Sequence, residues 1–141
     1  MQAYMQKNVE FNKANALKAQ RLINDELVEL GDEVHSNYIS KTNIVKETID
    51  IIYIAAQQLR RMGVDVDAAL AEVHRSNMSK SLPLDGTVDI VEELKVARQR
   101  YPEAGVKEGQ RHAVLIDADS GKVIKPTTYS PAIITKEMVG A

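Results

Sequence analysis

The sequence predicts an all-α protein, a four-helix-type bundle with one extra helix and a small β-hairpin toward its C-terminus. Hydrophobic residues make up 44% of the 141 residues, yet the chain has one Phe and no Trp. Aliphatic side chains must therefore fill the core, which suits helix packing. Apolar residues recur at spacings of three and four through the first two-thirds of the chain, as in helices. This helical pattern changes only after Gly105.

The first part of the chain is predicted to form four helices. The second of them has a single apolar stripe that includes Ile23, Leu27 and Leu30. Because Gly31 falls within the stripe, we expect that helix to kink or end near it. The four segments run from about residue 3 to 14, and over Ala16–His35, Thr42–Met62 and Val66–Asn77.

The third helix is the most hydrophobic segment of the chain. Its apolar residues occupy almost every side of the helix, a pattern typical of a central, buried helix. Gly63 supplies its stop signal, and Arg60 and Arg61 lie in its last turn. A bundle this thin is expected to complete its core with a second chain, as a homodimer or homotetramer.

The C-terminal part combines a loop, a helix and a hairpin. Ser76–Gly86 is predicted to be a loop, and Val88–Arg100 a fifth helix that ends before Pro102. Two short runs that flank Asp119-Ser120-Gly121 predict a hairpin, and the chain from Pro126 is expected to be an irregular tail. We therefore divide one domain into a helical core, residues 1–80, and a C-terminal extension, residues 81–141. The hairpin strands are His112–Asp117 and Lys122–Lys125.

Composition excludes several classes of function. With 18 basic and 20 acidic side chains, the net charge is -2, which argues against a nucleic-acid-binding surface. The chain has no cysteine, so disulfides, thiolate metal sites and a Cys nucleophile are excluded. The longest apolar run, Ile51–Ala56, is far shorter than the roughly 20 residues of a membrane span. We expect a cytoplasmic protein that binds neither membranes nor nucleic acid.

Four carboxylates form the strongest candidate site. Glu26 and Glu29 lie on the second predicted helix, and Glu47 and Asp50 lie on the third. Residues three apart share one face of a helix, so each helix presents two acids side by side. The short connection between the two helices favours an antiparallel hairpin, in which the two pairs face each other.

Such a cluster is costly without a cation. Two like charges 4 Å apart repel by about 4 kcal/mol at an effective dielectric of 20. All-oxygen ligands suit Mg²⁺ or Mn²⁺, and no His stands at the spacing of a di-iron bundle. Magnesium also shares its ligand sphere with substrate phosphates. On the residues alone, a metal site and a solvated acidic face both remain open.

The acidic pattern, with seventeen residues between its pairs, resembles the all-α nucleotide pyrophosphohydrolase superfamily. That superfamily includes MazG-like proteins, dimeric dUTPases, dCTP pyrophosphatases and phosphoribosyl-ATP pyrophosphohydrolases. Arg21–Glu26 is similar to the lead-in of its second helix, and Glu72–Lys80 resembles a segment of phage and bacterial MazG-like members. Gly121–Pro126 and Tyr129 are similar to the tail that follows. Residues 81–118 depart from the pattern.

The resemblance implies hydrolysis of a nucleoside triphosphate, (d)NTP, between its α and β phosphates, to (d)NMP and pyrophosphate. It further implies that the four acids bind Mg²⁺, with Mn²⁺ as a substitute, and activate water. It places Asn77 and Lys80 toward the substrate, and Asn12 is a candidate for the base pocket. The expected role is nucleotide-pool housekeeping, in a bacterium or by a phage protein in its host's cytoplasm. The alternative is a non-catalytic helical dimerisation or regulatory module with a vestigial acidic site.

Overall fold

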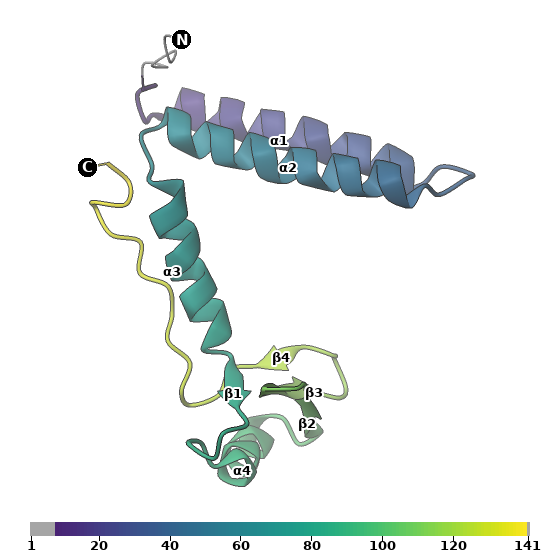
Figure 1. Ribbon diagram of the computed structural model, residues 1–141, viewed down its shortest axis with the longest axis vertical. Coiled ribbons are helices and arrows are strands. Elements are labelled where there is room, and N and C mark those ends of the chain that lie inside the picture. Colours follow the sequence, from purple (N-terminus) through teal and green to yellow (C-terminus); the bar gives the residue numbers. More distant parts are fainter. Residues whose placement is uncertain (1–7, 141) are drawn as a thin grey trace. The chain divides into compact units, whose positions relative to one another are not determined.

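The computed structural model describes residues 8–140, which contain four α-helices and four short β-strands (Figure 1). This arrangement confirms the predicted helical fold class with a small C-terminal β-element. No helix in that range is both long and apolar enough to cross a bilayer. The elements are α1 Lys13–Val34, α2 Lys41–Arg61, α3 Val66–Met78, β1 Ser81–Pro83, α4 Ile90–Arg100, β2 Ala104–Glu108, β3 His112–Asp117 and β4 Val123–Ile124.

The chain folds as two compact units. One contains the chain up to Ala69 together with the segment that starts at Thr135, and the other contains Leu70–Ile134. The boundary therefore falls within α3. The division at residue 80, which separates the helical core from the extension, stays a prediction.

The first unit is built on an antiparallel hairpin of α1 and α2, which lie side by side (Figure 1). The side-chain oxygen of Asn12 accepts a hydrogen bond from the backbone N–H of Asn15 at 2.8 Å and so caps α1. Ser40 caps α2 in the same way through the N–H of Asn43, at 3.3 Å. The side-chain amide of Asn43 also donates to a carboxylate oxygen of Glu33 at 3.1 Å, which links the two helices beside their connecting loop.

The ends of the first helices differ from the predicted ones. Residues 8–12 are not helical, because the cap at Asn12 starts α1 at Lys13. Of the helix predicted for residues 3–14, residues 13 and 14 therefore belong to α1, and residues 3–7 lie outside the described range. α1 continues past Gly31 to Val34, one residue before the predicted end at His35. One glycine costs a helix only about 1 kcal/mol relative to alanine, which packing against α2 offsets.

The prediction that the third helix is buried is also wrong for the single chain. On α2, Ile49 is 54% exposed, Ile52 60% and Tyr53 70%, and the buried residue of this helix is Gln58. The reason is geometric, because one neighbouring helix can cover only one side of another. The hairpin therefore keeps a broad apolar face open to solvent.

The second unit joins α4 to an antiparallel sheet. The strand order is β1-β3-β2, and β4 pairs with β3 beyond the end of β1. The β3–β4 pair confirms the predicted hairpin, with Gly121 in its turn at a φ of +73°. The core is formed where α4 covers the sheet. Its buried members are Leu82, Ala97, Ala104, Leu115 and Ile124.

Two of these strands were not predicted. β1 lies in the segment expected to be a loop, and α3 extends into that segment as far as Met78. β2 occupies the stretch before the predicted hairpin, where it pairs with β3 along its whole length. β1 pairs with β3, a strand distant in sequence, and local periodicity does not report such a partner. β2 forms a hairpin with β3, the next strand in the chain, across residues 109–111.

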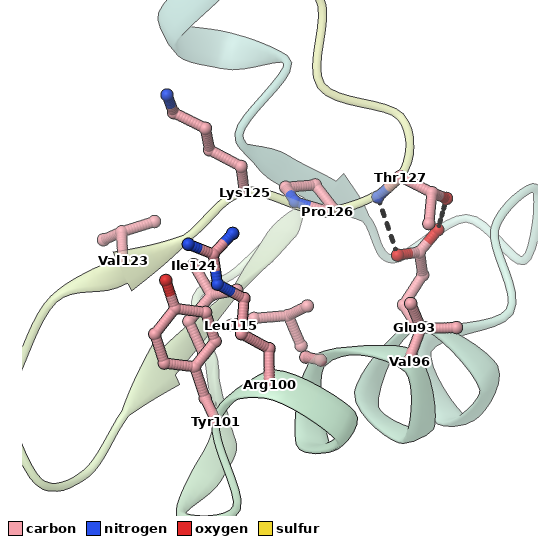
Figure 2. A pocket seen from close by; sticks show the side chains of 11 residues that line it. Glu93, Val96, Arg100, Tyr101, Leu115, Val123, Ile124, Lys125, Pro126 and Thr127 are labelled. Carbon is pink, nitrogen blue, oxygen red and sulfur yellow. Dashed lines mark hydrogen bonds between the residues drawn. The ribbon is translucent and has the colours of Figure 1, made fainter.

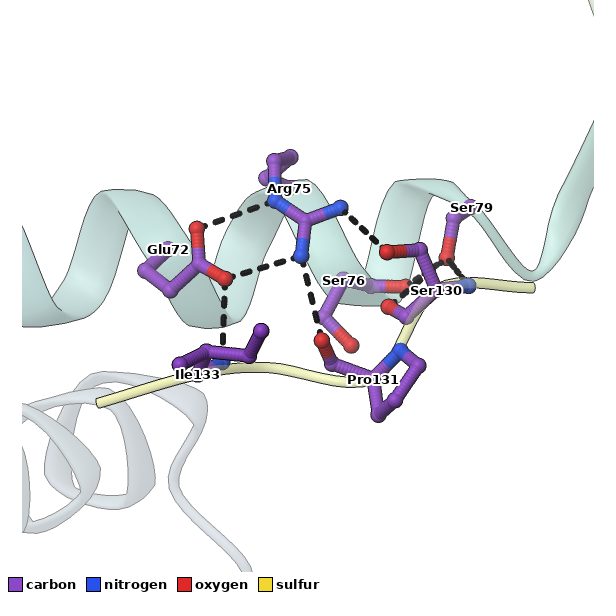
Figure 3. A network of polar contacts seen from close by, with 7 residues as sticks. All are labelled: Glu72, Arg75, Ser76, Ser79, Ser130, Pro131 and Ile133. Atoms are coloured by element: carbon purple, nitrogen blue, oxygen red, sulfur yellow. Dashed lines mark hydrogen bonds and ion pairs between the residues drawn. The ribbon is translucent and has the colours of Figure 1, made fainter. Parts of the chain in front are cut away.

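The C-terminal tail is irregular, as predicted, but it is firmly bound to α3 (Figure 3). Glu72 pairs with Arg75 at 2.8 Å and accepts a hydrogen bond from the backbone N–H of Ile133 at 3.0 Å. Arg75 also donates to the hydroxyl oxygen of Ser130 at 3.0 Å. The Ser79 hydroxyl accepts the backbone N–H of Ser130 at 2.8 Å. These contacts form a polar clasp that holds the tail along the helix.

The clasp predicts a pH-dependent stability. The bond from Arg75, and then that from Ile133, lower the pKa of Glu72 from 4.5 to about 2. Because the pKa of Glu72 is depressed, its contacts contribute fully to folding stability above about pH 4.5, and this contribution is lost as the pH falls toward 2. We expect Glu72→Gln to lower the melting temperature at neutral pH and to speed hydrogen exchange at Ile133.

The difference in melting temperature between Glu72→Gln and the native chain should shrink as both proteins are acidified through this pH range. Glu92→Gln is the matched control, because Glu92 pairs only with exposed Lys95 at 3.7 Å. A constant deficit at every pH would contradict the assignment of the ion pair as its source.

Candidate metal centre

Three carboxylates converge on the α1–α2 hairpin. Glu26 and Glu29 come from α1, and Glu47 comes from α2. One oxygen of each lies within 4.8 Å of the others. The spacing of three residues sets Glu26 and Glu29 on one side of α1, and the antiparallel packing carries Glu47 to the same place.

Glu47 is the most enclosed of these acids. Its side chain is 13% exposed, and one of its oxygens lies 3.3 Å from the ammonium of Lys46. The other oxygen, Oε2, is buried and has no hydrogen-bond partner among residues 8–140. A buried carboxylate oxygen without a partner loses its hydration and gains nothing in return. The Lys46 ammonium therefore satisfies one oxygen of Glu47 but not Oε2, and an unpartnered buried carboxylate oxygen fits a cation ligand.

Asp50 lies near the three, close enough for its charge to act on Glu26, but is not a member of the converging group. Its side chain is 36% exposed, and its Oδ2 is 2.7 Å from the ammonium of Lys46. Hydrogen bonds to Asp50, and then to Glu47, raise the pKa of Lys46. Lys46 is not among the residues predicted for the site, although Lys46 and Asp50 stand four residues apart, the spacing of a helical ion pair.

The neighbouring acids raise the proton affinity of Glu26. A hydrogen bond shared with Glu29 raises the pKa of Glu26 above its ordinary value, and burial acts in the same direction. The charges of Glu29, Asp50 and Glu47 add to the effect. Carboxylates this close repel one another when all are ionised, and a bound cation offsets this repulsion. Three oxygen donors with neither sulfur nor nitrogen fit a hard divalent cation.

The other predicted site residues are not members of this converging group. Asn12 caps α1 about four helical turns before Glu26, or about 20 Å along the axis, so the structure does not bring it to the acids. Asn77 and Lys80 belong to the second unit, where the Lys80 ammonium donates to the side-chain oxygen of Asn77 at 2.9 Å. The structure thus joins Asn77 to Lys80. The roles of all three toward a substrate stay predictions.

A comparison with protein families adds independent information about this part of the chain. A model for phosphoribosyl-ATP pyrophosphohydrolase matches residues 2–77, and so covers both helices of the acidic cluster and most of α3. No curated protein and no solved structure matches the chain. The match stops before β1, so the sheet and α4 lie outside it.

The crowded acids predict opposite responses to substitution with and without metal. Because a raised carboxyl pKa disfavours the ionised form in the folded protein, Glu26→Gln should keep or raise the melting temperature in chelator at neutral pH. With magnesium chloride, the native chain should gain more stability than Glu26→Gln, because binding to the folded state stabilises it.

Differential scanning calorimetry with and without magnesium measures both effects. Asp32→Asn, an exposed substitution on the same helix, is the control and should follow the native chain. Equal metal-induced shifts in the native chain and Glu26→Gln would show that Glu26 is no ligand.

Proposed function

Because the chain belongs to the phosphoribosyl-ATP pyrophosphohydrolase family, within the MazG-like superfamily, we propose that it is a magnesium-dependent nucleoside triphosphate pyrophosphohydrolase. Membership makes it a nucleotide pyrophosphohydrolase that cleaves an acid anhydride. The proposed reaction converts (d)NTP and water to (d)NMP and pyrophosphate. The observation that carries the proposal is the cluster of Glu26, Glu29 and Glu47, with one buried carboxylate oxygen that lacks a partner.

Each acid has a part in the proposed chemistry. Glu26, Glu29 and Glu47 would hold the cation, since their oxygens already converge. Bound magnesium supplies charge that offsets the phosphates and lowers the pKa of water. A carboxylate that is not a ligand accepts a proton from the attacking water. Asp50, which stands outside the cluster but beside it, has that position.

Lys46 would change partners when substrate arrives. Its ammonium bridges Glu47 and Asp50 at 3.3 and 2.7 Å, where it offsets part of their charge. Its side chain is 64% exposed and free to turn outward. Lys46 therefore stabilises the acids before the cation binds and releases them afterwards.

The substrate contacts follow from the same proposal. Lys80 would face the phosphates together with Asn77, and Asn12 would contribute to the base pocket. The family model is described by one substrate, phosphoribosyl-ATP. The proposed substrates are nucleoside triphosphates, and phosphoribosyl-ATP is the alternative substrate that the assay has to include.

The assay is release of pyrophosphate by the purified chain. The ribo- and deoxyribonucleoside triphosphates and phosphoribosyl-ATP are each incubated with magnesium, and pyrophosphate is measured against a chelator control. We expect release from at least one triphosphate. No release from any compound, with no magnesium binding by calorimetry, would instead support the helical dimerisation or regulatory module.

Substitutions in the cluster test the assigned roles. A bound metal contributes several kcal/mol to catalysis, so Glu47→Ala should lower the rate by about a hundredfold or more. Asp50→Ala should also lower the rate but leave magnesium affinity closer to native. Asp32→Ala is the matched control and should retain full activity. If Asp50→Ala kept the native rate, Asp50 would not be the proton acceptor.

We also propose that the chain is a homo-oligomer that buries the open face of α2. Ile49, Ile52 and Tyr53 are more than half exposed on one helix. A hollow of about 430 Å³ lies beside them, between Tyr53 and Arg60. Exposed apolar surface of this kind marks interaction sites. A second copy would present the same apolar face, which suits a symmetric dimer.

Ile52→Asp should convert the oligomer to monomer, because a carboxylate buried in an apolar interface loses its hydration. Sedimentation velocity measures the change directly. Thr42→Asp, on an exposed position of the same helix, should leave the assembly intact. A native chain that sediments as a monomer at all concentrations would end the proposal.

A further inference from the structure

The second unit contains a hollow that the acidic site does not use. It measures about 490 Å³ and lies between the C-terminal half of α4 and the segment from Val123 to Thr127 (Figure 2). Ligand pockets range from about 300 to 1,000 Å³, so the hollow is large enough for a small organic molecule. It also lies outside the part of the chain that the family model matches.

The walls of the hollow are mostly apolar. Val96 and Ala97 line it from α4, Leu115 and Ile124 from the sheet, and Pro126 from the segment after β4. Tyr101 adds an aromatic ring at the end of the helix. Sites for small ligands typically combine such walls with a few polar groups that fix the ligand's orientation.

A buried contact holds the two sides of the hollow together. Glu93 on α4 is 8% exposed, and one of its oxygens accepts the backbone N–H of Thr127 at 3.0 Å. Its other oxygen accepts the Thr127 hydroxyl (Figure 2). Both oxygens of this lining acid are therefore engaged. The contact fixes the segment with Lys125 and Pro126 against the helix.

Two cations of the lining lack acidic partners. The Arg100 guanidinium lies 5.6 Å from the ring centre of Tyr101, and the Lys125 ammonium lies 4.7 Å from that of Tyr129. Neither makes an ion pair within the described part of the chain. In Figure 2 Arg100 reaches from α4 toward Ile124, whereas Lys125 extends outward from the rim. An apolar hollow with two such charges favours an anion.

We propose that this hollow binds a nucleoside monophosphate. A phosphate monoester carries a charge of about -1.5 to -2 at neutral pH, which matches two cations rather than one. The guanidinium of Arg100 can grip two phosphate oxygens at once, and Lys125 adds a second charge from the rim. The base and sugar then lie against the apolar wall and the ring of Tyr101. The inference stands on this unit alone and does not depend on catalysis at the acidic cluster.

The test measures binding to the full chain in chelator, without turnover. AMP, CMP, GMP and UMP are each titrated at up to millimolar concentration while backbone amide resonances are followed. We expect saturable shifts at Arg100, Tyr101, Lys125 and Thr127 with at least one nucleotide, and weaker binding of its unphosphorylated nucleoside. Losing one charge-assisted contact should weaken binding by about tenfold or more in Arg100→Ala and in Lys125→Ala.

The controls are Arg111→Ala and Lys122→Ala, which remove exposed cations of the same unit that do not line the hollow. Both should bind as the native chain does. The proposal is overturned if none of the four nucleotides produces saturable shifts, if inorganic phosphate binds as tightly, or if the shifts are confined to α1 and α2. Unchanged affinity in Arg100→Ala would overturn it too. None of these outcomes depends on pyrophosphate release, so each proposal fails or stands separately.

Discussion

The repulsion among the carboxylates of the α1–α2 hairpin is the constraint on which the site depends. Packing brings Glu26, Glu29 and Glu47 within 4.8 Å of one another, and the resulting crowding raises the pKa of Glu26. A single ammonium, that of Lys46, offsets part of this charge from the side. The buried Oε2 of Glu47 accepts no hydrogen bond from that ammonium. A divalent cation would relieve the repulsion and supply the missing partner at once.

The same hairpin leaves an apolar face of α2 exposed among residues 8–140. Two packed helices shield one side of each other, and the acids occupy part of the surface that remains. The apolar residues Ile49, Ile52 and Tyr53 therefore have no cover of their own. Under the proposed function, α2 would present its acids to a cation and its apolar face to a second copy of the chain. The acids stand at Glu47 and Asp50, and the open apolar face continues from there toward the end of the helix.

Sequence reasoning succeeded where the determinants are local. The apolar periodicity located the four helices of residues 8–140. The three-residue spacing pointed to four acids, of which the hairpin brings Glu26, Glu29 and Glu47 together and leaves Asp50 outside the group. The failures involve contacts between distant segments. β1 exists because Leu82 pairs with Ala113, and the tail is ordered because Ile133 and Ser130 meet side chains of α3. The exposure of α2 was misjudged because a hydrophobic pattern shows that a helix needs cover, and not whether its own chain supplies it.

The two candidate sites differ in the sign of their charge. The net charge of -2 averages over a cluster of acids in one unit and a hollow with Arg100 and Lys125 in the other. A phosphate compound without a metal is repelled by the first and attracted by the second. Under the two proposals, a triphosphate would reach the acids only with a cation that reverses their field, whereas a monophosphate would need no cation at the hollow. The requirement for a divalent cation therefore distinguishes a ligand of the acidic cluster from a ligand of the hollow, even where both carry the same base.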